Sequence, residues 1–326
     1  MTGPPLISFI IPVRNDAARL KRCLEAIEAS GTPAHVEVIV ADNGSDDGSA
    51  GVAEAAGATV ISVPVASVAH VRNVAAARAC GALLAFVDAD HVIDRAWVSS
   101  ALAIFSGRNI VAAGAPYVAP PGGNWVQRSY GRLRPVTKGQ RGAEWLGSGN
   151  LIVRKKAFDA VEGFDATLES CEDVDLCNRL RSAGYRLVAD ERLRSVHFGD
   201  PATLRAVFFG ELWRGRDNIR VTFRGPLSLS SLPSAIIPMV ELLCVGALLG
   251  GRWFGARVGA TAAMTFVAFA ALRAARMTLS RRPSGPVVFV RCLVVAAAYD
   301  LGRALALVAR VTHRSRREIA KGQAVA

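Results

Sequence analysis

The sequence predicts an α/β protein with a doubly wound parallel sheet, followed by a C-terminal region of apolar helices. Apolar runs of strand length alternate with helix-like segments over residues 6–87. Short buried strands that alternate with helices form parallel sheets with helices on both faces. From residue 232 onward the chain becomes strongly apolar, with two stretches of 19 residues that carry one charge each. The sequence therefore predicts an α/β domain first and an apolar helical region after it.

The elements of the first half follow from the hydrophobic pattern. Continuous apolar runs of about four to eight residues predict strands, at Leu6–Val13, Val36–Ala41, Thr59–Val63 and Leu83–Val87. Helical spacing or alanine-rich composition predicts helices at Arg19–Ala29, Ser49–Ala56 and His70–Cys80. Because ligands bind at the carboxyl ends of strands in such sheets, the polar residues after each run are candidates for a site.

The second half is less regular. Pro116–Gly142 is rich in Gly, Pro, Arg and aromatic residues without a clear period, which predicts a long loop or lid. Beyond it, the pattern predicts a strand, a helix, a second helix closed by Gly184 and a final strand. These lie at Leu151–Val153, Ala157–Val161, Val174–Ala183 and Leu187–Ala189.

The C-terminal region indicates membrane contact. Leu232–Gly250 and Phe254–Leu272 each approach the roughly 20 residues that a spanning helix needs. Glu241 and two prolines weaken the first stretch, so two spans and a re-entrant hairpin both stay open. Pro286–Tyr299 is short for a span, and the polar residues that follow suit an amphipathic helix on the inner membrane surface. The shared polar face of that helix holds Asp300, Arg303, Arg310, Arg314 and Arg317.

Charge and cysteine content exclude several classes of protein. The net charge is +12, and residues 232–326 carry thirteen Lys and Arg against three acids. Basic charge in the most apolar part favours a membrane with anionic headgroups over a nucleic acid. The six cysteines have no Cys-x-x-Cys spacing, which argues against a disulfide framework and a zinc ribbon. Because no secretory signal starts the chain, we expect the first domain in the cytoplasm.

Two carboxylates follow the predicted strand Leu83–Val87. Asp88 and Asp90 are two residues apart at the end of a buried run, where they can share a divalent cation. Mg²⁺ and Mn²⁺ prefer oxygen ligands and often bind the phosphates of a substrate as well. Asp-x-Asp alone is common, and two solvated carboxylates in a turn would give the same pattern.

Other segments make the pattern more specific. Ser8–Asn15, Val38–Ser49, Ala69–Asn73 and Phe86–His91 occur in an order and spacing that resemble the inverting glycosyltransferases of family 2, which have the GT-A fold. The resemblance continues downstream, at Gly147–Leu151, Gly163–Asp165, Glu172–Leu176 and His197. It covers about 190 residues, from Ser8 to Phe198.

The resemblance implies a donor site for a nucleotide-diphosphate sugar. In that family the first Asp of Asp-x-Asp faces the ribose and the last holds the metal, which gives Asp88 and Asp90 these roles. Asp42 would pair with the edge of the base, and Arg72 would lie near the nucleotide. The nucleotide-sugar site as a whole would contain Pro12, Val13, Asp42, Arg72, Asp88 and Asn150.

The resemblance also implies a catalytic base. An inverting transfer needs a group that takes the proton from the acceptor hydroxyl, and Asp173 is the candidate. Asp173 starts a helix, whose dipole alone would lower its pKa. Acids are also favourable at a helix N-terminus without any catalytic role, and Glu172 is the neighbour most easily confused with the base. We expect His197 to act as a further metal ligand beside Asp90; His91 is a weaker candidate.

We therefore predict an inverting glycosyltransferase that uses Mg²⁺ or Mn²⁺. Residues 1–230 would form a cytoplasmic GT-A catalytic domain, and residues 231–326 a membrane-associated helical region. The acceptor would be a lipid-linked or membrane-proximal glycan. A nucleotidyltransferase is one alternative, although Ile11–Arg19 lacks the glycines of a triphosphate loop. A catalytically dead GT-A scaffold at the membrane is the other.

Overall fold

The structure is a computed structural model that describes residues 7–31, 36–107, 109–225, 232–280 and 285–309. These residues belong to two units, which are described here one at a time. Unit 1 comprises Met1–Val118 and Thr137–Gly199, and unit 2 comprises Ala119–Val136 and Asp200–Ala326. The boundary predicted at residue 230, between a catalytic domain and a membrane-associated region, stays a proposal.

Unit 1 is built on an eight-stranded sheet with the order β3-β2-β1-β4-β8-β6-β9-β7. The strands are β1 Ile7–Val13, β2 Val36–Asp42, β3 Thr59–Ser62, β4 Leu83–Val87, β6 Ile110–Gly114, β7 Gln140–Gly142, β8 Asn150–Arg154 and β9 Arg186–Asp190. Each run predicted as a strand contains a strand, although Val63 lies just beyond the end of β3 and Leu6 lies outside the described residues.

The sheet is mixed, so the prediction of a parallel sheet is wrong for its second half. β1 runs parallel to β2 and β4, but β8 is antiparallel to both β4 and β6. β7 is antiparallel to β9 as well. A buried run looks the same in either direction, because burial on both faces requires apolar residues at every position. The hydrophobic pattern therefore carries no information on strand direction.

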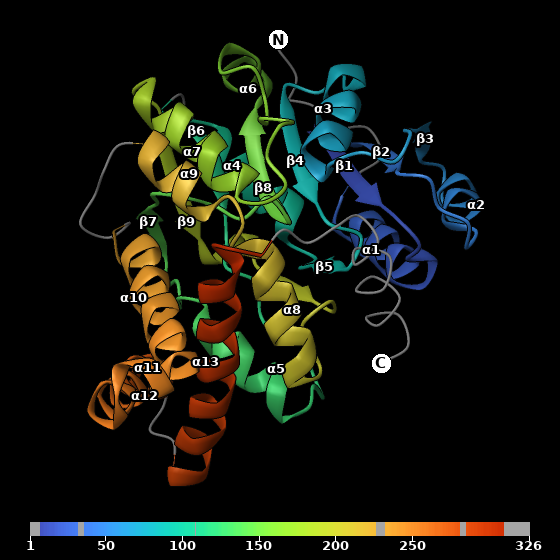
Figure 1. Cartoon of the computed structure of the whole chain (residues 1–326). Helices are drawn as coiled ribbons and strands as arrows, with labels where there is room; N and C mark the ends of the chain where they lie inside the picture. The colour runs from blue at the N-terminus through green and yellow to red at the C-terminus, as the bar shows by residue number, and fades with distance from the viewer. Residues whose placement is uncertain (1–6, 32–35, 108, 226–231, 281–284, 310–326) are drawn as a thin grey trace. The chain divides into compact units, whose positions relative to one another are not determined.

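Helices cover both faces of this sheet (Figure 1). Core residues of α1 (Ala17–Ser30), α2 (Ser49–Ala55) and α4 (Trp97–Phe105) pack with alternate residues of β1, including Phe9 and Ile11. Those of α3 (Val68–Arg78), α6 (Lys155–Ala160) and α7 (Glu172–Ser182) pack with the opposite face, which includes Ile10 and Phe86. Phe9, Ile10 and Ile11 are all fully buried, which explains the continuous apolar run.

A second, two-stranded sheet lies in unit 1. Strand β5 (His91–Ile93) follows the Asp-x-Asp segment, and β10 (Ser195–His197) pairs with it in antiparallel register. Both strands have three residues, too few for a periodic pattern in the sequence to mark them. Helix α4 and strand β6 were not predicted at all.

Unit 2 consists of helices. They are α5 Trp125–Tyr130, α8 Leu204–Arg214, α9 Asn218–Arg224, α10 Leu232–Leu249, α11 Gly251–Phe254, α12 Ala256–Leu279 and α13 Pro286–Ala306. Its core combines α5, α8, α12 and α13 through residues such as Tyr130, Val207, Met277 and Val295.

The segment Pro116–Gly142 is not the continuous loop that its composition predicted. It contains α5, a 3₁₀ turn at Gly131–Leu133 and strand β7. A capping box between Asn124 and Gln127 starts α5. Since this helix has only six residues, its fold depends on the cap and on packing against the rest of unit 2 and not on a visible period.

Helix α13 also differs from its prediction, because its polar residues face the interior of unit 2. Asp300 is fully buried and accepts a hydrogen bond from Arg273 at 2.6 Å. Arg303 donates to Glu211 at 2.7 Å. These two residues do not form part of an exposed amphipathic face. Arg310, Arg314 and Arg317 lie outside the described residues.

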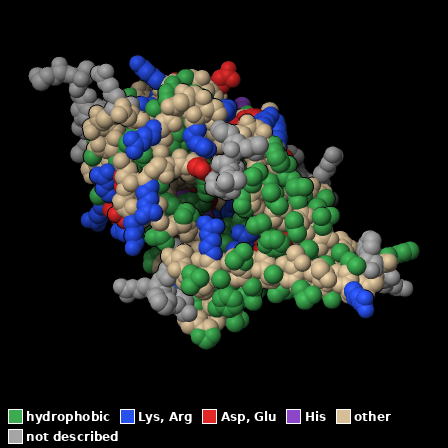
Figure 2. All heavy atoms as spheres, turned by 90° about the vertical axis from the view of Figure 1, so that its left-hand side faces the viewer, with side chains coloured by type: hydrophobic (Ala, Val, Ile, Leu, Met, Phe, Trp, Pro, Cys, Tyr) green, Lys and Arg blue, Asp and Glu red, His purple; other side chains and the backbone are tan. Residues whose placement is uncertain are grey.

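Helices α10 and α12 match the two apolar stretches predicted from the sequence. Among the described residues, they are the two helices that are long and apolar enough to cross a membrane. They expose large apolar side chains to the outside, among them Leu243, Met264 and Leu272, and hydrophobic side chains gather on this face (Figure 2).

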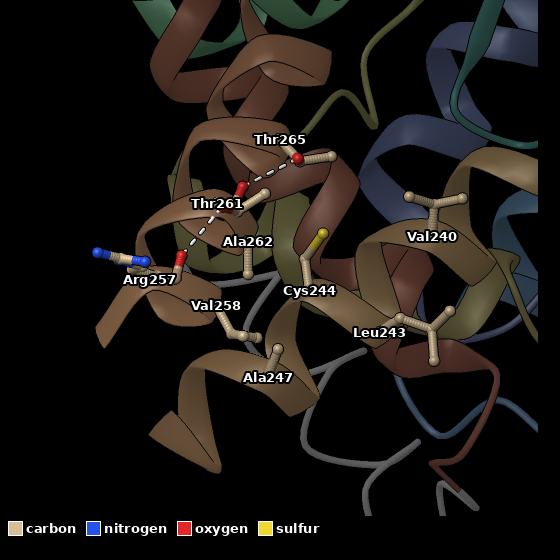
Figure 3. Close-up of a pocket in the computed structure, with 9 residues that line it drawn as sticks. All are labelled: Val240, Leu243, Cys244, Ala247, Arg257, Val258, Thr261, Ala262 and Thr265. Carbon is tan, nitrogen blue, oxygen red and sulfur yellow. Dashed lines mark hydrogen bonds between the residues drawn. The ribbon is translucent and has the colours of Figure 1, made fainter. Parts of the chain in front are cut away.

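A groove of about 460 Å³ lies between α10 and α12 (Figure 3). The Thr261 and Thr265 hydroxyls on its wall donate to carbonyls of their own helix. The groove therefore presents mainly apolar groups, with Arg257 as the charged residue among those that line it.

Candidate active site

The carboxyl ends of β1, β2 and β4 lie together in unit 1. Val13 is opposite Asp42 in the register of β1 and β2, and the Val13 carbonyl accepts a hydrogen bond from the Asn43 amide at 2.9 Å. The buried Asp42 carboxylate accepts a bond from the Ser45 amide at 3.1 Å. Three residues predicted for the nucleotide-sugar site are therefore neighbours at one edge of the sheet: Pro12, Val13 and Asp42.

Asp88 leaves β4 and is held by an arginine. The Arg72 guanidinium donates to Asp88 Oδ1 at 2.6 Å through Nη2, and to Glu172 Oε1 at 2.7 Å through Nη1. Arg72 is only 2% exposed. Its two carboxylate partners outweigh the effect of burial and raise its pKa. The structure thus brings Arg72 and Asp88 together, as the sequence predicted, and adds Glu172 to them.

Asp90 lies beside two histidines. Asp90 Oδ2 is 3.2 Å from His197 Nε2, and Asp90 Oδ1 is 4.0 Å from His91 Nε2. Pairing of β5 with β10 sets His91 opposite His197, which brings these residues together although 106 positions separate them. The possible ligand atoms of the three residues lie within 4.8 Å of one another. The predicted pair of Asp90 and His197 is therefore close in space, and the weaker candidate His91 lies in the same cluster.

The cluster has the properties of a cation site. Asp90 Oδ1 is buried without a hydrogen-bond partner among the described residues. Burial disfavours the charged carboxylate, but the His197 and His91 rings outweigh it and hold the pKa of Asp90 well below its ordinary value. A buried, ionised oxygen without a partner is costly unless a cation or a donor approaches it. The residues present therefore fit a divalent metal ion.

Two glycines let the backbone approach these carboxylates. A Cβ on Gly199 would lie 1.9 Å from Asp90 Oδ2, and one on Gly149 would lie 2.7 Å from Asp88 Oδ2. Both distances are shorter than any real side chain allows, so only glycine fits either position unless a carboxylate moves.

Asp173 lies in the first turn of α7. Its carboxylate accepts bonds from the Val174 amide at 2.8 Å and the Ser148 amide at 3.3 Å. Burial and the nearby Glu172 charge nevertheless raise its pKa to about 7. The helix dipole alone would lower this pKa, but desolvation outweighs the amide dipoles. A carboxylate with a pKa near neutrality is well matched to general-base chemistry.

Glu172, the alternative base, is already engaged. Its Oε1 accepts from Arg72 and from the Ser148 hydroxyl at 3.1 Å, and its side chain is largely buried. These bonds fix Glu172 as an internal link between α3, α7 and the segment before β8.

Asn150 lies in the interior of unit 1. Its amide nitrogen donates to the carbonyls of Ala115 and Leu193, and its Oδ1 accepts from the Trp97 indole at 3.0 Å. At 1% exposure, Asn150 ties β8 to neighbouring segments. A direct contact with the donor stays a prediction.

Several residues of the site were not predicted. Tyr117 packs its ring against His91 and His197, with centroids 4.7 and 4.9 Å away. Ser195 lies 2.9 Å from His91 Nδ1, and Ser148 contacts Glu172 and Asp173 on α7. No motif marks Tyr117 or Ser195, whereas Ser148 lies within the Gly147–Leu151 motif, from which only Asn150 was predicted as a site residue.

Comparison with solved structures defines the class of fold. The mannosyltransferase PcManGT from Pyrobaculum calidifontis, solved with GDP-Man and Mn²⁺, is similar over 91% of this chain and 88% of its own, with a TM-score of 0.62 and 16% identity. This similarity and the mixed sheet show a GT-A α/β fold.

Sequence comparison gives the family. Residues 8–159 match Glycosyl transferase family 2. Glycosyltransferase AglE of Haloferax volcanii is 28% identical over 244 residues, which are 69% of this chain and 77% of that protein. Succinoglycan biosynthesis protein ExoA of Rhizobium meliloti is 27% identical over 322 residues, 90% of this chain and 92% of its own. The chain belongs to glycosyltransferase family 2, as its motifs predicted.

The protein is therefore a glycosyltransferase that takes a sugar from a nucleotide-sugar donor. The family assignment argues against the nucleotidyltransferase that the sequence left open.

Proposed function

We propose that this protein is an inverting glycosyltransferase that transfers a sugar by metal-assisted single displacement at the membrane. Asp173 acts as the base, and Asp88 and Asp90 hold the donor end of the site. One observation carries the proposal: a carboxylate with a raised pKa, Asp173, and the donor carboxylate Asp88 lie against the same short segment of chain. Gly147 borders Asp173 and Gly149 borders Asp88, so the short segment 147–149 lines both groups.

Asp90 and His197 are the residues proposed to hold the metal ion, with His91 in reach. When bound, a divalent ion neutralises the charge that develops on the diphosphate leaving group. A carboxylate with imidazole nitrogens suits Mn²⁺ better than Mg²⁺, which demands near-ideal octahedral oxygen ligation. The Mn²⁺ in the related mannosyltransferase supports this choice.

Each remaining residue has a role that follows from its place. Pro12, Val13 and Asp42 line the edge where the base of the nucleotide would bind. Asp88 would face the ribose, with Arg72 holding it in position. Asp173 would take the proton from the acceptor hydroxyl on the side opposite the leaving diphosphate, which inverts the anomeric carbon.

Donor binding tests the metal-assisted part of the proposal. We expect one nucleotide sugar from a panel that includes GDP-mannose, UDP-glucose and UDP-N-acetylgalactosamine to raise the melting temperature of the full chain with Mn²⁺ but not with EDTA. A ligand that binds only the native state stabilises by about 2.7 kcal/mol at 100 times its Kd. NMR of the transferred sugar should show the anomeric configuration opposite to that of the donor. Retention would refute single displacement, and an equal shift in EDTA would refute the metal.

The acceptor is proposed to be a lipid-linked or membrane-proximal glycan. The exposed apolar faces of α10 and α12 support membrane insertion, and Arg273 and Arg276 near the end of α12 suit the cytoplasmic side. ExoA, similar over most of this chain, is a succinoglycan biosynthesis protein, which supports a glycan acceptor. The catalytic residues would then lie on the cytoplasmic side, where nucleotide sugars are made.

Labelling in intact cells tests this topology. In a variant of the full chain, a cysteine at Trp253, which is 90% exposed between α10 and α12, should react with a membrane-impermeant maleimide. A cysteine at Arg276 is the matched control and should react only after permeabilisation, as should the exposed native Cys80. Labelling at 276 without labelling at 253 would reverse the orientation. No external labelling at either position would favour a re-entrant or interfacial hairpin.

A further inference from the structure

A buried bridge joins the donor carboxylate to the base helix. Arg72 extends from α3 and shares its guanidinium between Asp88 after β4 and Glu172 on α7, at 2.6 and 2.7 Å. Each side chain comes from a different element, and the Arg72 and Glu172 side chains are 3% and 9% exposed. Only a planar guanidinium offers two such donors in a fixed arrangement.

The bridge continues to Asp173. The Ser148 hydroxyl donates to Glu172 Oε1 at 3.1 Å, and the Ser148 amide donates to Asp173 Oδ2 at 3.3 Å. Asp173 also follows Glu172 directly in the chain. A continuous set of hydrogen bonds therefore leads from Asp88 through Arg72, Glu172 and Ser148 to the proposed base.

We propose that Arg72 is a positioning residue that couples the donor carboxylate Asp88 to the base Asp173 through Glu172 and Ser148. In this role Arg72 acts on the nucleotide sugar only through Asp88. The inference rests on the proposed function, since it takes Asp173 as the base. It adds that the placement and the protonation of that base depend on the ion pair of Arg72 with Glu172.

The charges of the bridge act on Asp173 in opposite directions. The Glu172 carboxylate raises the pKa of Asp173, and the Arg72 guanidinium lowers it. The thiol of Cys177, on the same helix, stays neutral because burial raises its pKa. The aromatic rings of Tyr117 and Trp145 lie nearest to Gly147 beside Asp173, and neither ring is charged at neutral pH.

Melting curves of the full-length chain between pH 5 and pH 9 test the coupling without any donor. Because folding raises the pKa of Asp173, its contribution to stability is present at low pH and is lost as the pH rises through about 7. Glu172→Gln keeps the shape but removes the negative charge, so the midpoint of this loss should move to lower pH. Arg72→Gln should move it to higher pH. We expect each shift to be on the order of one pH unit.

Arg72→Lys and Arg179→Gln complete the set. Lysine keeps the positive charge, so the midpoint of Arg72→Lys should stay close to that of the wild type. It cannot donate to both carboxylates in the way a guanidinium does. If Arg72→Gln fails to fold, a downward shift in Glu172→Gln beside an unchanged midpoint in Arg72→Lys supports the coupling, and no shift in Glu172→Gln overturns it. Arg179 pairs with Asp175 on α7 at 2.8 Å and is not part of the bridge, so Arg179→Gln should leave the midpoint unchanged.

Opposite shifts for the charge-removing variants at residues 72 and 172 would support the coupling. Equal midpoints, or shifts in the same direction, would overturn it and leave Arg72 as a structural clamp. Because these curves need no donor, they decide the coupling even where no nucleotide sugar is turned over. A failure to transfer sugar from any nucleotide sugar would count against the proposed function and not against the coupling.

Discussion

Asp173→Asn is expected to lower the rate of sugar transfer by about 10²–10⁴-fold while donor affinity stays close to that of the wild type. The amide keeps the size of the side chain and its place in the first turn of α7, but it cannot accept the acceptor's proton. Steady-state transfer and Mn²⁺-dependent donor binding should be measured on the same preparation. Wild-type turnover should also rise as the pH increases through about 7, as Asp173 loses its proton.

Two comparisons make this result specific. Asp159→Asn changes an exposed carboxylate of the same unit, on α6, and should leave transfer unchanged. Glu172→Gln should retain far more activity than Asp173→Asn, because Glu172 is bound by Arg72 and Ser148. If Asp173→Asn turns over normally and the Glu172 variant is inactive, Glu172 is the base and the proposed assignment is wrong.

Asp90→Asn is expected to abolish the Mn²⁺-dependent part of donor binding. The substitution removes the one carboxylate of the cluster with His91 and His197, and with it the buried oxygen that has no hydrogen-bond partner among the described residues. Because the amide has nearly the same shape, unit 1 should still fold. Isothermal titration with Mn²⁺ and the donor selected from the panel should show binding in the wild type and none in the variant.

Asp94→Asn is the matched control for Asp90. Asp94 lies four residues further on, in an exposed pair with Arg194 at 3.2 Å, and its replacement should leave metal-dependent binding intact. An Asp90 variant that still binds donor and Mn²⁺ with wild-type affinity would show that the metal is held elsewhere.

Much of unit 1 could be predicted because its strands are buried on both faces. Burial makes β1, β4 and the second half of β2 largely apolar runs, and each strand ends at the polar residues of the site. The same rule found β8 and β9, but it could not give the direction of β8. It did not mark the short strands β5 and β10, because three residues carry no usable period.

The candidate site was predictable where its residues form local motifs. Asp88 and Asp90 share one motif, and Asp173 lies in another, so each was found from its neighbours in the chain. Tyr117 and Ser195 have no such motif and reach the site only because strand pairing and loop packing bring them there. Ser148 lies within the Gly147–Leu151 motif, but its contacts with Glu172 and Asp173 exist only in the folded chain. The sequence also could not show that Arg72 is shared between two carboxylates.

The sequence by itself determined the family, the alternation of strands and helices in unit 1 and the two apolar helices α10 and α12. These follow from local composition and from motifs within single segments, which do not depend on how the chain folds back on itself. The tertiary structure decided the mixed direction of the sheet and the meeting of Asp90 with His197. It also decided the interior position of Asp300 on α13 and the burial that raises the pKa of Asp173. Each of these depends on desolvation or on contacts between distant segments, and only the folded chain sets either.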